Sequence, residues 1–136
     1  MKNKYLKTLA LATAAFCTVA LAGCGKTADT TTSSSLHAVT YENQQYQVPT
    51  SPQRIVTLSN SLLNMLNAVD GTSLARVDST EKLPEKLQAL PSLGHEANIN
   101  MEQLLSLKPD LVLGLSTQHS KLSGQLEGAH IPFVPI

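Results

Sequence analysis

The side chains best suited to chemistry in this 136-residue chain are short polar groups that follow apolar runs. Five of them could form hydrogen bonds with a small molecule: Ser59, Asn60, Thr80, His95 and Gln118. Hydroxyl and amide groups both donate and accept hydrogen bonds, and an imidazole can also bind a transition metal. We therefore interpret these five residues as candidate contacts to a bound solute.

The same residues offer no recognisable catalytic arrangement. Ser59 and Ser116 follow predicted strands, but neither stands in the G-x-S-x-G pattern of a nucleophile elbow, and no acid and base can be assigned to them. Ser59-Asn60-Ser61 also occupies the place where a nucleotide-binding chain would carry a glycine-rich phosphate loop. We therefore expect a binding protein rather than an enzyme, with no catalytic residue and no cofactor.

A different chemistry is indicated near the start, where Leu21-Ala22-Gly23 precedes Cys24. Three lysines lead into an apolar run over residues 8–22, which is shorter than the roughly 20 residues that a membrane-spanning helix needs. Small residues before a cysteine are typical of a lipoprotein signal, in which the thiol receives a diacylglyceryl group and becomes the new N-terminus. The alternative is a plain secretory signal with a chance cysteine.

We predict a lipoprotein signal peptide at residues 1–23, lipidation of Cys24 and a solvated polar tether at residues 24–35. Two or three acyl chains anchor a protein stably, so we expect an exported protein held at the periplasmic or outer face of a membrane. Cleavage would leave seven basic against ten acidic residues and no cysteine for a disulfide. We expect no nucleic-acid partner, because no basic face remains.

Downstream, apolar residues alternate between the spacing of strands and that of helices. A β-hairpin is predicted at residues 36–41 and 45–48, followed by strands at 54–58, 74–78, 110–115 and 131–136. Helices are predicted at 62–69, 101–107 and 120–127, with a helical turn at 84–89 and Asn100 as the N-cap of the middle helix. Strands separated by helices predict an α/β fold, a Rossmann-like parallel sheet with flanking helices, preceded by the small β-hairpin.

Parallel sheets of this kind bind ligands where the carboxyl ends of their strands meet. The predicted loops at that edge are residues 59–61, 78–80, 93–96 and 116–119, which together form a polar rim. For His95, the alternatives are ligation of a metal or haem and a solvated histidine bonded to Glu96, and no metal site is assigned. His119 is expected to be exposed near a helix start rather than to contact the ligand. Arg54 and Arg76 could balance an anionic siderophore or form surface ion pairs, and we expect the ion pairs.

Three segments carry a family resemblance: residues 52–59, 90–94 and 100–113. Together they resemble the N-terminal lobe of substrate-binding proteins of ABC importers for iron-siderophore complexes, haem and cobalamin. The most specific segment is Leu107-Lys108-Pro109-Asp110-Leu111-Val112-Leu113 with the helix before it, and the order and spacing match over residues 40–136. The resemblance implies that residues 36–136 form an incomplete N-terminal lobe of a two-lobed protein, whose ligand lies between the lobes.

The resemblance also implies the partners. The protein would capture an iron-siderophore, haem or corrinoid and deliver it to a permease with its ATPase, and Glu102 stands where the family carries a permease-docking carboxylate. The simpler interpretation of Glu102 is a first-turn acid favoured by the helix dipole. Two features depart from the family: Leu63-Asn64 replaces a frequent Thr-Glu pair, and residues 78–81 lack a frequent tyrosine.

Three other functions stay open at this point. The first is a zinc- or manganese-binding protein of a related importer, in which His95 would be a ligand. The second is a lobe-only surface module without a transport function. The third is a cell-surface enzyme on a similar scaffold, whose catalytic residues would lie in sequence beyond this chain.

Overall fold

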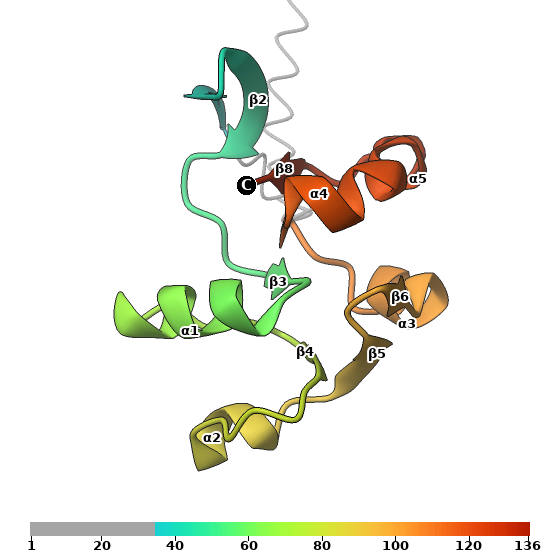
Figure 1. Ribbon diagram of the computed structural model, residues 1–136. Coiled ribbons are helices and arrows are strands. Elements are labelled where there is room, and N and C mark those ends of the chain that lie inside the picture. The colour runs from blue at the N-terminus through green and yellow to red at the C-terminus, as the bar shows by residue number, and fades with distance from the viewer. Residues whose placement is uncertain (1–34) are drawn as a thin grey trace, which may run out of the picture. The chain divides into compact units, whose positions relative to one another are not determined.

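The computed structural model describes residues 35–136 (Figure 1). The predicted signal peptide, Cys24 and all but the last residue of the predicted tether lie outside the described residues. Between residues 35 and 136, no helix combines the length and the apolar character needed to cross a membrane.

The first described element is the expected hairpin, in which β1 (Leu36–Tyr41) pairs antiparallel with β2 (Gln44–Pro49). Glu42 and Asn43 form the two-residue turn, with φ angles of 46° and 62°. Positive φ at both central positions matches the right-handed twist of the strands that the turn connects. The hairpin therefore closes with the tight geometry that its short connection requires.

Two groups of strands form the body of the fold. Parallel strands lie in the order β3 (Ile55–Thr57), β7 (Leu111–Gly114) and β8 (Phe133–Pro135). The second group is β4 (Arg76–Asp78), β5 (Ser92–His95) and β6 (Asn98–Ile99), with β4 and β5 parallel and β5 and β6 antiparallel. The Leu74 N–H donates to the Ile55 carbonyl at 2.8 Å, so the segment leading into β4 runs along β3. The predicted α/β class with a parallel sheet is confirmed, and β6 adds an antiparallel strand.

Helices connect these strands as expected, with shifted boundaries. They are α1 (Asn60–Ala68), α2 (Glu85–Gln88), α3 (Met101–Ser106), α4 (Ser116–His119), the 3-10 helix η1 (Ser120–Leu122) and α5 (Ser123–Gly128). Asn100 caps α3 as predicted, because its Oδ1 accepts from the Gln103 N–H at 3.0 Å. The loops predicted at 59–61 and 116–119 were wrong in part, because α1 and α4 already begin within them. Ser59 starts α1 early by accepting from the Leu62 N–H at 3.2 Å.

Both faces of the β3-β7-β8 sheet are covered. On one face, the fully buried Val56 and Val112 belong to a core with Leu104 of α3 and Leu126 of α5. A second cluster joins Leu111 and Val134 to Val48 of the hairpin. A third, smaller cluster joins α1 to α2 through Leu63, Leu83 and Leu87. Each fully buried aliphatic side chain stabilises the folded state by about 1.5–3 kcal/mol. The clusters therefore keep the strands, and the loops that follow them, in fixed positions.

Hydrogen bonds tie the starts of β3 and β7 together. The Asp110 carboxylate accepts from the backbone N–H groups of Gln53 at 2.7 Å and Arg54 at 2.9 Å. In return, the Arg54 guanidinium donates to the carbonyls of Leu107 and Lys108 at the end of α3. Within residues 35–136, the Arg54 side chain therefore forms these hydrogen bonds in place of the predicted ion pair, whereas Arg76 does pair with Asp78 at 3.3 Å. We call the Arg54–Asp110 arrangement the amino-edge clamp.

Candidate functional site

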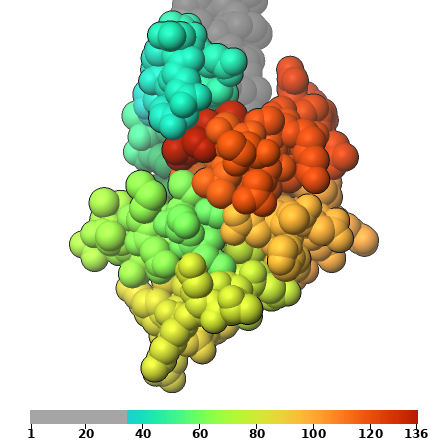
Figure 2. All heavy atoms as spheres, in the orientation of Figure 1, coloured from blue at the N-terminus to red at the C-terminus, as the bar shows by residue number. Residues whose placement is uncertain are grey.

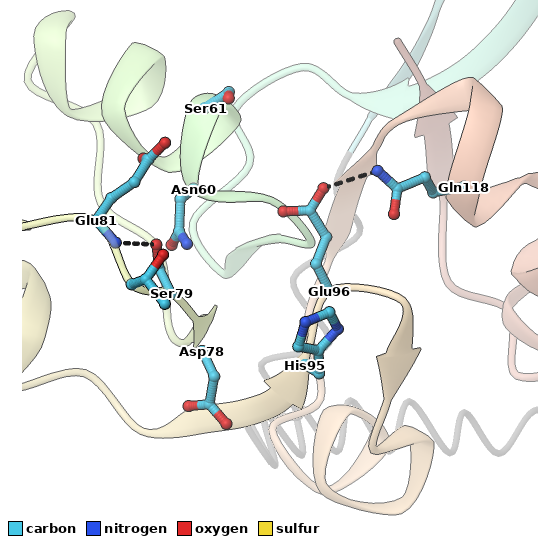
Figure 3. A pocket seen from close by; sticks show the side chains of 9 residues that line it. Asn60, Ser61, Asp78, Ser79, Glu81, His95, Glu96 and Gln118 are labelled. Carbon is cyan, nitrogen blue, oxygen red and sulfur yellow. Dashed lines mark hydrogen bonds between the residues drawn. The ribbon is translucent and has the colours of Figure 1, made fainter.

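A polar pocket of about 480 Å³ lies at the carboxyl ends of β3, β4, β5 and β7 (Figure 3). Its walls are Asn60, Ser61, Asp78, Ser79, Thr80, Glu81, His95, Glu96 and Gln118. In Figure 2, α1 in green and the segment around α4 in orange adjoin on the face shown. The strand β3 lies between β7 on one side and the chain entering β4 on the other, which is where α/β sheets of this type form their ligand crevice.

Four of the five predicted contact residues line this pocket. Asn60 comes from the start of α1, Thr80 from the segment after β4, His95 from the end of β5 and Gln118 from α4. Ser59 is absent from the walls, because it is 1% exposed and its hydroxyl caps α1. The structure thus brings four predicted residues together and gives the fifth a supporting position.

His95 reaches the pocket through an irregularity in β5. Arg76 pairs with Ser92 while Asp78 pairs with His95, so β5 has one residue more than β4 over the same length. Gly94 has a φ of +87°, a value that L side chains rarely adopt. Such a bulge bends a strand and redirects the side chain that follows. Residues 93–96 were predicted as a loop, and the structure instead forms β5 from residues 92–95.

The imidazole of His95 is exposed, and its Nδ1 accepts from the Ala97 N–H at 3.2 Å. The solvated alternative named a bond to Glu96, and the structure has instead a bond to the backbone amide two residues further along. Within residues 35–136, no three histidine, cysteine, aspartate or glutamate side chains gather closely enough to hold a metal ion. The Nε2 of His95 is the ring atom left to meet a ligand.

His119 was predicted to be exposed, and this was wrong: it is 1% exposed. Its Nδ1 accepts from the Leu115 N–H at 2.9 Å, and its Nε2 lies 2.9 Å from the Glu96 carbonyl oxygen. A ring that accepts at Nδ1 must carry its proton at Nε2, which then donates to Glu96. His119 therefore links the start of α4 to the turn after β5, two neighbouring parts of the pocket wall.

Two further bonds strengthen this link. The Gln118 amide donates to the Glu96 carboxylate at 3.1 Å, which Figure 3 shows as a dashed line, and the Lys121 ammonium donates to the Ala97 carbonyl at 3.5 Å. Sequence reasoning missed this connection because residues 116–121 are mostly polar and resemble a solvated loop. The only signal was a histidine one turn after the apolar strand β7.

Asn60 has an unusual position among the wall residues. The residue is 6% exposed, and among residues 35–136 its Oδ1 has no hydrogen-bond partner. A buried amide oxygen without a partner costs about 1–3 kcal/mol, so such atoms are rare in folded proteins. Figure 3 shows the Asn60 side chain extending from the start of α1 toward Ser79, on the inner side of the pocket. Asn60 is thus placed to accept a bond from a molecule in the pocket.

Glu102 lies apart from the pocket walls. It is exposed in the first turn of α3, where its carboxylate is favoured by the helix dipole. This placement leaves the carboxylate accessible to a partner, and its docking role stays a prediction.

Comparison with known proteins identifies the family. The model of the periplasmic binding protein family matches residues 55–136, which include β3 to β8 and every wall of the pocket. This chain belongs to that family. The predicted resemblance to substrate-binding proteins is confirmed. The observed fold is consistent with one lobe of such a protein.

Relatives of this chain are considerably longer. The putative ABC transporter substrate-binding lipoprotein YhfQ of Bacillus subtilis is 28% identical over 129 residues, covering 89% of this chain and 40% of YhfQ. The Fe(3+) dicitrate-binding periplasmic protein FecB of Escherichia coli is 33% identical over 85 residues, covering 58% of this chain and 28% of FecB. The chain therefore spans about a third of the length of such relatives.

A solved structure shows the same fold. Staphylococcus aureus SirA, complexed with staphyloferrin B, superimposes with a TM-score of 0.64 at 24% sequence identity. The match covers 73% of this chain and 36% of SirA. The strands and helices of this chain are thus arranged as in one part of SirA.

Proposed function

We propose that this chain is the N-terminal lobe of a solute-binding lipoprotein of an ABC importer, which captures an iron-siderophore, haem or cobalamin. The observation that carries the proposal is a polar pocket at the carboxyl edge of the sheet in a member of the periplasmic binding protein family. Relatives named for Fe(3+) dicitrate and for a siderophore support the solute class.

In this proposal the lobe forms one wall of a cleft, and a facing lobe encloses the solute. Asn60, Thr80, His95 and Gln118 would form hydrogen bonds with the solute, while Ser59 fixes the start of α1 behind them. Nothing in this role requires a bond to be broken. The protein would bind its solute reversibly and act as no enzyme.

Export and delivery complete the proposal. Lipidated Cys24 would hold the protein at the membrane surface, and residues 24–35 would let the lobe reach its permease. Glu102 would contact basic residues of that permease, whose ATPase drives uptake. The names of the relatives, which include ABC transporter substrate-binding lipoproteins, support this location.

Calorimetric titration of the full-length protein with ferric siderophores, haem and cobalamin tests the proposal. One of these ligands should bind, and His95→Ala should weaken that binding about fivefold to tenfold, as expected for one lost hydrogen bond. His37→Ala is the matched control, because His37 is exposed on the hairpin and does not line the pocket.

Two results would contradict the proposal. Binding of none of the three ligand classes would remove the solute assignment. Binding of zinc or manganese alone, lost in His95→Ala, would indicate a metal-ion importer instead.

A further inference from the structure

The pocket is acidic, which bears on the kind of solute that the proposed function would involve. Three carboxylates line it, those of Asp78, Glu81 and Glu96, and no lysine or arginine is among its described walls. Asp78 forms an ion pair with Arg76 at 3.3 Å. Within residues 35–136, Glu81 and Glu96 have no ion-pair partner, so two negative charges face the pocket uncompensated.

One feature opposes this charge. The N-terminus of α1 lies in the pocket wall and contributes roughly half a positive charge from its aligned peptide dipoles. Its first turn holds no acidic residue. Half a charge offsets only part of the two free carboxylates, so the pocket retains a negative potential.

Asn60 independently indicates which ligand groups suit this pocket. Its buried Oδ1 is an acceptor without a donor, and it lies at the wall that Glu81 and Ser79 share (Figure 3). An acceptor is satisfied by an N–H or O–H group of a ligand, and an anionic carboxylate or phenolate offers none. Both the charges and the buried acceptor therefore favour a ligand that presents positive charge and hydrogen-bond donors.

We infer that, within the proposed solute class, this lobe selects a metal complex whose facing side is cationic and rich in donors. An ammonium-bearing hydroxamate chelate has this chemistry. Ferric citrate, tris-catecholate complexes and the propionate edge of haem have the opposite chemistry, because each would place anionic oxygens against Glu81 and Glu96. The inference rests on the proposed function and narrows its substrate.

Three ferric trihydroxamates that differ only in a pendant group provide the test. The group is an ammonium in the first, its neutral acetamide in the second and its anionic succinamide in the third. A unit charge about 7 Å from a carboxylate in partly solvated surroundings changes affinity by roughly fivefold to tenfold. The full-length protein should bind the ammonium form tightest and the succinamide form weakest. Cationic aquacobalamin and neutral cyanocobalamin extend the comparison to corrinoids.

Variants assign the effect to this lobe. Glu81→Gln and Glu96→Gln keep the side-chain shape and should reduce the preference for the cationic over the neutral ligand several-fold. Glu42→Gln removes the same charge from the hairpin turn, away from the pocket walls, and should leave the preference unchanged. Asn60→Leu should weaken binding of the cationic ligand without lowering stability, because it removes an acceptor that has no partner in the part of the chain that the structure describes.

The outcomes separate this inference from the proposed function. Tightest binding of ferric dicitrate, a catecholate complex or haem would overturn the charge preference and leave the importer role intact. An unchanged preference in Glu81→Gln and Glu96→Gln would also overturn it. If no iron chelate, haem or corrinoid binds, the proposed function itself fails.

Discussion

Replacement of His119 by phenylalanine removes both ring nitrogens while keeping a planar ring in the same buried space. In the native protein, these nitrogens bond to the Leu115 N–H and to the Glu96 carbonyl, both at 2.9 Å. A buried polar group that loses its partner costs about 1–3 kcal/mol. Because Leu115 and Glu96 are half-buried, water can reach them in part, and we expect a total loss of about 2–3 kcal/mol.

Urea denaturation of the full-length protein measures this loss as a lower midpoint with an unchanged slope. Ligand affinity should fall as well, because Glu96 and Gln118 would no longer be held beside each other in the pocket wall. His119→Gln can restore one of the two bonds and should lie between the native protein and the phenylalanine variant. His37→Phe is the matched control, since this histidine is exposed and surface changes are usually within about 0.5 kcal/mol.

The reasoning would be refuted if His119→Phe changed the free energy of unfolding by less than about 0.5 kcal/mol. It would also fail if hydrogen exchange at the Leu115 amide stayed as slow as in the native protein. Either result would mean that packing alone, without the two bonds, holds α4 against the turn after β5.

Four further predictions concern other parts of the chain. Asp110→Ala should lower the unfolding free energy by about 2 kcal/mol in urea, because two backbone donors lose a charged acceptor, and Asp110→Asn should cost less. Gly94→Ala should lower the unfolding free energy by about 1–2 kcal/mol in the same assay, because the φ of Gly94 is +87° and an L side chain is strained there. The same change should weaken ligand binding by shifting His95. Glu102→Gln should leave the ligand dissociation constant unchanged and reduce uptake by cells. Cys24→Ser should abolish labelling by radioactive palmitate and release the protein from membranes.

Two of these predictions have direct controls. Glu85→Gln removes a first-turn acid from α2, as Glu102→Gln does from α3, and should not reduce uptake. Equal uptake by both variants would remove the docking role of Glu102. Membrane retention of Cys24→Ser would show that another segment anchors the protein.

Strong apolar periodicity made several elements predictable from the sequence. The continuous run over residues 110–115 indicated β7, and Asn100 before an amphipathic stretch indicated the start of α3. Knowing that loops converge at the carboxyl ends of parallel strands was sufficient to group Asn60, Thr80 and His95. These predictions depend on local sequence and on general rules of sheet topology.

The remaining features depend on contacts between distant residues. Strand β5 contains only one fully buried apolar residue, Leu93, beside a glycine, so its identity as a strand comes from pairing with β4. His119 is buried because the backbone groups of Leu115 and Glu96 form hydrogen bonds with its two nitrogens. The spacing of apolar residues in the sequence cannot predict such bonds. The start of α1 could not be predicted, because the sequence around Ser59 allows this residue to be either a helix cap or a loop residue.

The amino-edge clamp and the pocket lie at opposite ends of the same strands. Arg54 and Asp110 secure the beginnings of β3 and β7, while the solute-facing residues follow the strand ends. Changes in the pocket therefore leave the clamp's hydrogen bonds intact. Replacing the loops that follow the strand ends with those of another importer should accordingly leave the protein able to fold. The fold could thus acquire a new solute specificity while the hydrogen bonds at the strand starts stay unchanged.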